Sequence, residues 1–209
     1  MSTTPTYTTN WFEARQRYFE KYLTPLAGRD YLNFLEVGVF EGRSVIWCLD
    51  NILTAEHSSI ICVDTFMGSP EHEHLGAEVE GLFDRFKQNV EPYKQKVITY
   101  PGSSYLMLRS LPLRAFDFVY IDGSHYGADV LEDAVLAWRN LRKGGIMAFD
   151  DYLWTFHTNR YGEEPKPMHD NEEDLVLHEP KIAIDAFLEI YKHRYELLDR
   201  GEQVWIKKI

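Results

Sequence analysis

The stretch AFDFVYIDGSHYGADVLEDAVLAWRNLRKGGIMAFDD, residues 115–151, decides the fold that the sequence predicts. Its two ends, 115–122 and 145–151, are short apolar runs that close on aspartates, whereas 128–141 has a helical period. One face of that helix carries the apolar residues Val130, Ala134, Trp138 and Leu141. Strand, helix and strand in this order predict a βαβ unit with two parallel strands.

The same alternation fills the chain before this stretch. Strands are predicted at 31–39, 58–64 and 96–100, and helices at 43–53, 75–91 and 103–111. The strand segments lack polar alternation, which is typical of strands that are buried on both faces. We therefore expect an α/β fold with a mostly parallel sheet and right-handed crossovers.

The last part of the chain breaks this rhythm. A helix predicted at 181–192 is followed by RYELLDR (194–200) and EQVWIKK (202–208), joined at Arg200-Gly201. Such a junction is typical of a hairpin, so the sheet is expected to end in an antiparallel pair.

The remaining segments are expected to belong to one domain spanning 1–209. Residues 1–10 are polar and predict a flexible tail, and 11–26 predict an N-terminal helix with an aromatic stripe. That stripe would cover a sheet edge or pair with a second chain, so a homo-oligomer stays open. Residues 152–178 have no clean period and follow a strand end, which predicts a lid or substrate insertion.

The composition limits the classes of function. The 209 residues carry 22 basic and 33 acidic side chains, a net charge of −11. That balance disfavours a broad grip on nucleic acid or on an anionic membrane. No apolar run is long enough to span a bilayer, and the polar start lacks a signal-peptide pattern. The two cysteines, Cys48 and Cys62, lie in apolar runs and predict reduced core thiols, so we expect a cytoplasmic protein.

Glycines follow the first predicted strand in EVGVFEGRS (36–44). Gly38 and Gly42, with three residues between them, allow a tight turn and close backbone approach to a ligand. Phe40 stands where a dinucleotide fingerprint has its second glycine. An ordinary turn between a strand and a helix is the alternative interpretation.

The next two strands also end in polar residues. Asp64 closes the second strand, where a carboxylate can bind both hydroxyls of a ribose or simply cap a turn. Gly102 and Ser103 follow the third strand, where free N–H groups can bind an adenine edge or cap the following helix. Together with the glycine turn, these residues favour a nucleoside-type cofactor.

The strongest cluster follows the strands of the opening stretch. Asp122-Gly123-Ser124-His125 ends one strand and Asp150-Asp151 ends the other. If these strands are neighbours, three carboxylates converge at one sheet edge, and a divalent cation would relieve their repulsion. The alternative is that the acids cap helices or pair with nearby cations. An unperturbed imidazole has a pKa of about 6.5, so a histidine such as His125 is a candidate to accept a proton near neutral pH.

These motifs together resemble class I S-adenosylmethionine-dependent methyltransferases. The resemblance rests on FLEVGVFEGRS (34–44), ICVD (61–64) and above all VYIDGSHYGADVLEDAVLAWRNLRKGGIMAFDDY (119–152). Within that class the chain is most similar to the branch of macrocin- and mycinamicin-type sugar O-methyltransferases. The resemblance implies a Rossmann-like, seven-stranded sheet with an antiparallel last strand and helices on both faces.

The resemblance also implies roles for individual residues. The residues implied to bind S-adenosylmethionine include Asp122. The others are Glu36, Gly38, Gly42 and Ser44 for the methionine part, Asp64 for the ribose, and Gly102 and Ser103 for the adenine. The acids Asp122, Asp150 and Asp151 match metal ligands for Mg²⁺ or another divalent cation. His125 matches a general base. Catechol-type relatives usually have Lys and Asn at the positions of His125 and Asp151, so a sugar-like alcohol is the favoured acceptor.

The sequence therefore predicts a cation-dependent O-methyltransferase. Its acceptor would be a sugar-containing or other small polyhydroxylated compound, with neither nucleic acid nor membrane as partner. One alternative is an NAD-type oxidoreductase, against which the missing middle glycine and the antiparallel ending argue. The other is a non-catalytic module that binds the cofactor or a partner.

Overall fold

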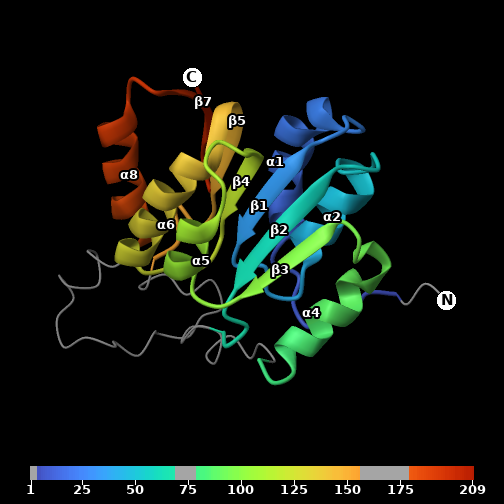
Figure 1. The fold of residues 1–209 in the computed structure, drawn as a ribbon. Coiled ribbons are helices and arrows are strands. Elements are labelled where there is room, and N and C mark those ends of the chain that lie inside the picture. The colour runs from blue at the N-terminus through green and yellow to red at the C-terminus, as the bar shows by residue number, and fades with distance from the viewer. Residues whose placement is uncertain (1–3, 69–78, 156–178) are drawn as a thin grey trace, which may run out of the picture. The chain divides into compact units, whose positions relative to one another are not determined.

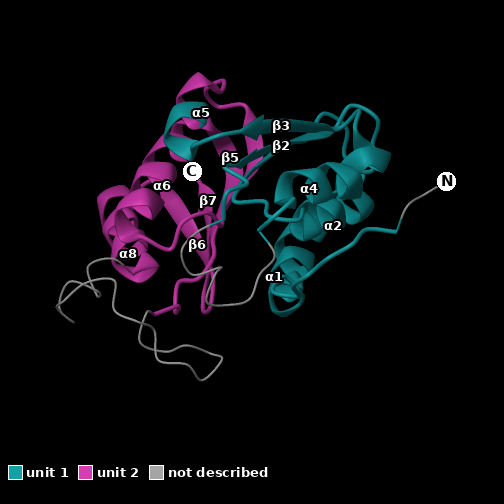
Figure 2. Ribbon diagram, turned by 90° about the horizontal axis from the view of Figure 1, so that it is seen from below, with its two compact units in different colours: residues 1–107 teal, residues 108–209 magenta. Residues whose placement is uncertain are grey.

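The computed structural model describes residues 4–68, 79–155 and 179–209. The chain divides into two compact units, residues 1–107 and 108–209 (Figure 2). Within the described ranges no helix has the length and apolar character needed to cross a membrane.

Unit 1 alternates helices and strands. Its elements are α1 (Glu13–Leu23), η1 (Thr24–Leu26), β1 (Asn33–Val37), α2 (Arg43–Asn51), β2 (Ser59–Asp64), α4 (Leu82–Val90), η2 (Glu91–Tyr93) and β3 (Val97–Pro101). β2 pairs in parallel with both β1 and β3, in the registers Val37↔Val63 and Asp64↔Pro101. The ends of these strands therefore meet at one edge, as the sequence predicts.

Apolar side chains fill the interior of unit 1. Phe34, Leu35 and Val63 have no exposed surface. Helices α1, α2 and α4 lie on one side of β2 and β3 (Figure 2). Cys48 and Cys62 are free and fully buried, and this burial raises the pKa of both thiols well above the ordinary value. Both cysteines are therefore core residues, as the sequence predicts.

The first described residues are hydrogen-bonded to unit 1. The amide of Thr6 donates to Asn89 Oδ1 over 2.8 Å, and that of Thr8 to Glu41 Oε2 over 2.9 Å. Glu41 also forms an ion pair with Arg85 of α4, at 2.7 Å. These contacts place part of the predicted tail, 1–10, against the turn that follows β1.

Unit 2 contains residues 115–151, for which the sequence predicts a βαβ unit. Its elements are β4 (Phe116–Ile121), α6 (Gly127–Asn140), β5 (Leu141–Phe149), α8 (Pro180–Tyr191), β6 (Tyr195–Arg200) and β7 (Val204–Lys208), and α5 (Ser104–Ser110) spans the boundary between the units. β4 and β5 are parallel, and every residue of β4 is buried. The predicted βαβ unit is confirmed.

The terminal hairpin enters the sheet in an unexpected order. β7 pairs antiparallel with β5 and with β6, so the last strand lies between them. The seven strands have the order β3-β2-β1-β4-β5-β7-β6. This mostly parallel sheet with an antiparallel last strand confirms the predicted fold class.

Helices α6 and α8 lie side by side in unit 2 (Figure 1). Trp138 of α6 meets Phe187 of α8 edge-on at 5.6 Å, and Phe187 also contacts Phe149 of β5 at 5.5 Å. Since all three rings are nearly inaccessible, this contact joins both helices to the sheet.

Two predicted boundaries differ from the structure. β5 begins at Leu141 rather than 145 and ends at Phe149, which leaves Asp150 and Asp151 in the turn beyond it. The helix predicted at 75–91 is observed as α4, Leu82–Val90, while 75–78 lie outside the described residues. Most of the predicted lid, 156–178, also lies outside them.

Candidate functional site

The three predicted acids converge in unit 2. The register Ile121↔Phe149 aligns the ends of β4 and β5, so Asp122 and Asp150 follow at the same edge. Carboxylate oxygens of Asp122, Asp150 and Asp151 all lie within 4.8 Å of one another. The strand ends therefore bring together the acids that the sequence predicted.

The spacing of these oxygens fits a single cation. Mg²⁺ holds oxygen ligands at about 2.1 Å and Ca²⁺ at about 2.4 Å, so ligands on opposite sides of an ion lie about 4.2 or 4.8 Å apart. The three side chains are only partly buried, which leaves room for water or acceptor oxygens to complete the coordination. The donor set is entirely oxygen, as hard divalent cations prefer.

A buried hydrogen-bond chain holds Asp150. Tyr120 donates its hydroxyl to Asp150 Oδ2 over 2.9 Å, and Gln203 donates Nε2–H to Asp150 Oδ1 over 3.1 Å. Gln203 also lies 3.0 Å from the Tyr120 hydroxyl and accepts from Trp205 Nε1 over 2.9 Å. Tyr120, Gln203 and Trp205 are at most 1% exposed. Hydrogen bonds to a metal-binding carboxylate fix its orientation.

The sequence did not reveal this hydrogen-bond chain. Gln203 and Trp205 come from the terminal hairpin, and they reach Asp150 only because β7 pairs with β5 in the register Phe149↔Val204. The sequence does contain one indication, the spacing of Gln203 and Trp205, because residues two positions apart on a strand point to the same face. A polar Gln203 on the same face as a buried tryptophan indicates a satisfied polar contact.

His125 lies beside the acids. Its Nε2 is 2.7 Å from Asp151 Oδ2, and its ring stacks on Trp154 with centroids 4.5 Å apart. Asp151 has a φ of +53°, an uncommon conformation for aspartate, and its carbonyl accepts from the Trp154 amide over 2.9 Å. The turn thus fixes His125 through a carboxylate on one side and an indole on the other.

The remaining predicted residues belong to unit 1, where Asp64 is central. Its Oδ2 accepts from the amides of Val39 and Phe40 at 2.8 and 2.9 Å, and its Oδ1 accepts from Phe66 over 2.7 Å. Its carbonyl accepts from the Gly102 amide over 2.8 Å. A carboxylate offers about four acceptor positions, so the side chain retains capacity for one more donor.

The turn that follows β1 has positive φ angles, which favour glycine. Gly38 and Gly42 have φ of +83° and +79°, and Phe40 between them also has a positive φ, +46°. A Cβ on Gly42 would lie 3.0 Å from the Phe86 ring of α4. Packing therefore explains Gly42 without a ligand, and its role toward a cofactor stays a prediction.

Glu36 and Ser44 flank this turn. Glu36 is 1% exposed and accepts a hydrogen bond from the Ser44 hydroxyl on α2. After β3, Gly102 has a φ of +151° and the carbonyl of Ser103 accepts from Leu106 and Met107 as α5 begins. The seven predicted residues of unit 1 thus surround the ends of β1, β2 and β3.

Removal of the Tyr120 hydroxyl tests whether the hydrogen bond to Asp150 supports cation binding. Tyr120→Phe should weaken Mg²⁺ binding about tenfold, because Asp150 loses a donor that orients it. Unfolding should become easier by about 1 kcal/mol, since Gln203 also loses a partner. Calorimetric titration with Mg²⁺ and thermal unfolding measure the two effects.

Tyr152→Phe is the matched control. Tyr152 is also buried, and its hydroxyl donates to Asp185 over 2.9 Å and accepts from Arg200, away from Asp150. This variant should lose similar stability and bind Mg²⁺ normally. Equal Mg²⁺ affinity in the two variants would contradict the orienting role of Tyr120.

Comparison with known families matches residues 35–152 to the family described as "Methyltransferase domain". Among curated proteins, an uncharacterized protein of Acanthamoeba polyphaga mimivirus, R132, is 29% identical over 124 residues. That alignment covers 59% of this chain and 53% of the viral protein, so the chain matches about half of the relative's length.

Solved structures show the same fold. MycE, a methyltransferase from the mycinamycin biosynthetic pathway in complex with Mg and SAH, has a TM-score of 0.60 at 14% identity. The match covers 99% of this chain and 55% of MycE. The O-methyltransferase TomG from Streptomyces achromogenes, in complex with SAM, also scores 0.60 at 14% identity, covering 93% and 79%. The expected methyltransferase fold is confirmed.

Proposed function

Because the chain belongs to the methyltransferase-domain family, we propose that it transfers a methyl group from S-adenosylmethionine to a hydroxyl of a small acceptor. The acceptor would be a sugar-containing or other polyhydroxylated compound, and Mg²⁺ or another divalent cation would assist. The convergence of Asp122, Asp150 and Asp151 beside His125 is the observation that carries this proposal. A cytoplasmic location, without a nucleic-acid or membrane partner, is part of it.

The unit 1 residues support a nucleoside cofactor. The positive φ of Gly38 lets the backbone turn sharply at the end of β1, and Asp64 can accept one more donor at the end of β2. We assign the methionine part of S-adenosylmethionine to Glu36, Gly38, Gly42 and Ser44. We assign the ribose to Asp64 and the adenine to Gly102 and Ser103. Asp122 is the remaining residue that we propose for cofactor binding.

The unit 2 residues support the reaction at a hydroxyl. A divalent cation, when bound, supplies a positive charge that lowers the pKa of a coordinated alcohol. Asp122, Asp150 and Asp151 would hold it, and Tyr120 and Gln203 keep Asp150 oriented. His125, whose ring Asp151 and Trp154 hold in place, would take the proton of the acceptor hydroxyl.

Two structurally similar proteins support a small-molecule acceptor. MycE was solved with Mg, SAH and Mycinamycin VI, and TomG is named for tomaymycin synthesis. One of those proteins was therefore solved with a small molecule besides SAH, and the other takes part in the synthesis of one. That the present chain also acts on a small molecule is part of the proposal.

The alternatives have less support. An NAD-type oxidoreductase would leave the acid cluster of unit 2 without a use, and Phe40 stands where that motif needs glycine. A non-catalytic module would not need a histidine bonded to one of three clustered acids.

A transfer assay tests the proposed function. Labelled S-adenosylmethionine is incubated with panels of sugars, glycosides and catechols, with Mg²⁺ or with a chelator. We expect labelled product from hydroxylated non-aromatic acceptors and little with the chelator. Transfer to catechols alone would overturn the acceptor class, and equal transfer with the chelator would overturn the cation requirement.

A further inference from the structure

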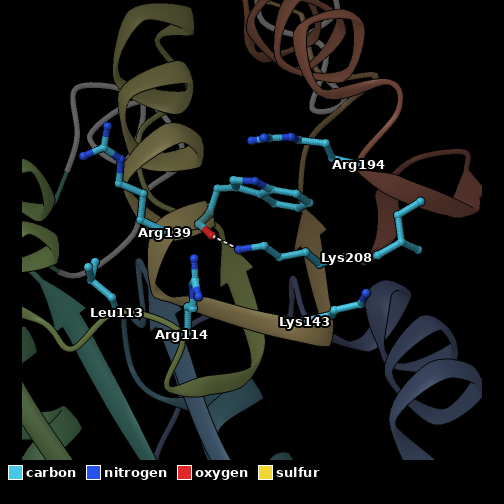
Figure 3. Close-up of a pocket in the computed structure, with 8 residues that line it drawn as sticks. Leu113, Arg114, Arg139, Lys143, Arg194 and Lys208 are labelled. Atoms are coloured by element: carbon cyan, nitrogen blue, oxygen red, sulfur yellow. Dashed lines mark hydrogen bonds between the residues drawn. The ribbon is translucent and has the colours of Figure 1, made fainter.

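A pocket of about 620 Å³ lies in unit 2 (Figure 3). Its lining includes Arg114, two residues before β4, and Lys143 near the start of β5. The clustered acids follow the opposite ends of these strands. Six residues of β4 separate the two ends, a distance of about 20 Å at the rise of a strand.

The pocket concentrates positive charge in an acidic chain. Five cations line it, whereas the whole chain carries a net charge of −11. The cations, from five separate segments, are Arg114, Arg139, Lys143, Arg194 and Lys208. Among the residues that the structure describes, no carboxylate lies within ion-pair distance of any of them.

Helix termini do not account for this charge. α6 ends at Asn140 and α8 at Tyr191, both next to the pocket, and each C-terminus carries about half a negative charge. Together they offset about one of the five cations. This leaves an excess of about four positive charges in the pocket.

Lys208 is fixed at the centre of the pocket. Its ammonium donates to the carbonyls of Trp138 and Leu141 at 2.6 and 2.8 Å and lies 4.7 Å from the centre of the Trp138 ring. Partial burial lowers the pKa of Lys208, and the charges of Arg114 and Arg194 lower it further. The pocket therefore maintains a repulsion among cations that a bound anion would relieve.

We propose that this pocket binds a small organic polyphosphate, a molecule with two or more phosphate groups. Arg114, Arg139 and Arg194 can each offer paired N–H donors to phosphate oxygens. Leu113 and Ile209, which are 70% and 58% exposed at the same pocket, provide apolar contact for the organic part. The volume lies in the range of small-ligand sites, about 300–1,000 Å³.

Calorimetric titration of the full chain with sodium tripolyphosphate, in buffer free of divalent metals, tests this site. We expect one binding site that weakens as salt rises. Arg139→Ala combined with Arg194→Ala should weaken binding at least about tenfold, because two charge-assisted contacts are lost. The matched control is Lys192→Ala with Lys207→Ala, which removes the same charge from exposed positions outside the pocket.

Three outcomes would overturn the proposal. The first is no binding of tripolyphosphate by the unaltered chain, and the second is an equal loss in the pocket variant and the control. The third is tighter binding of a single-stranded oligoribonucleotide, which would make the pocket part of a nucleic-acid surface. Thermal unfolding of both double variants distinguishes lost binding from lost folding.

Discussion

Asp150→Ala combined with Asp151→Ala should abolish the response of the protein to Mg²⁺. The double variant removes two of the three carboxylates whose oxygens lie within 4.8 Å of one another. One remaining carboxylate cannot hold the cation tightly, so we expect Mg²⁺ affinity and methyl transfer to fall by about a hundredfold or more. Calorimetric Mg²⁺ titration and the transfer assay measure the two losses.

The control must remove the same charge elsewhere. Asp84→Ala with Glu91→Ala does so on α4 and η2 of unit 1, where both acids are exposed and pair with lysines. This variant should keep its Mg²⁺ response and its activity. If Asp150 and Asp151 could be removed without loss of the Mg²⁺ response, the acid cluster would not be a metal site.

His125→Ala should lower turnover by about a hundredfold or more while cofactor affinity stays within about twofold. The reason is the loss of the group that takes the acceptor proton, and general bases contribute about 10²–10⁴-fold. Steady-state kinetics and titration with S-adenosylhomocysteine separate these effects. The Mg²⁺ affinity should change less than in the aspartate variant, because His125 contacts Asp151 through only one oxygen.

The chain contains a matched control for His125. His57 Nδ1 lies 2.8 Å from Asp30 Oδ2, and its ring stacks on Tyr31 at 4.9 Å. That pair is exposed, and its hydrogen bond raises the pKa of His57. His57→Ala should leave turnover unchanged. Full turnover of the His125 variant would remove that residue from the mechanism.

The sequence predicted the acid cluster because the cluster depends on local information. Asp122, Asp150 and Asp151 each follow an apolar strand, and the carboxyl ends of neighbouring parallel strands share one edge. Asp64 and Gly102 likewise follow successive predicted strands, and the structure joins them at the ends of β2 and β3. Their positions at strand ends could be read from the sequence, whereas the adjacency of the strands had to be assumed.

Contacts that depend on long-range pairing were not predictable in this way. Gln203 reaches Asp150 because β7 lies between β5 and β6. The sequence of the hairpin predicts that its two strands pair with each other, but it does not say which of them pairs with β5. Asp64 binds the amides of the glycine turn, although its position at a strand end predicted only a ligand or a cap. The cations that line the pocket, Lys208 included, come from segments up to 94 residues apart, so no local motif marks them.

Calorimetric titration with S-adenosylhomocysteine and, separately, with NAD is the most direct test of the proposed function. Each titration is run with Mg²⁺ and with a chelator. We expect tight binding of S-adenosylhomocysteine at one site and no heat from NAD. Binding of NAD alone would contradict the proposed methyl transfer, and binding of neither would favour a non-catalytic role for this fold.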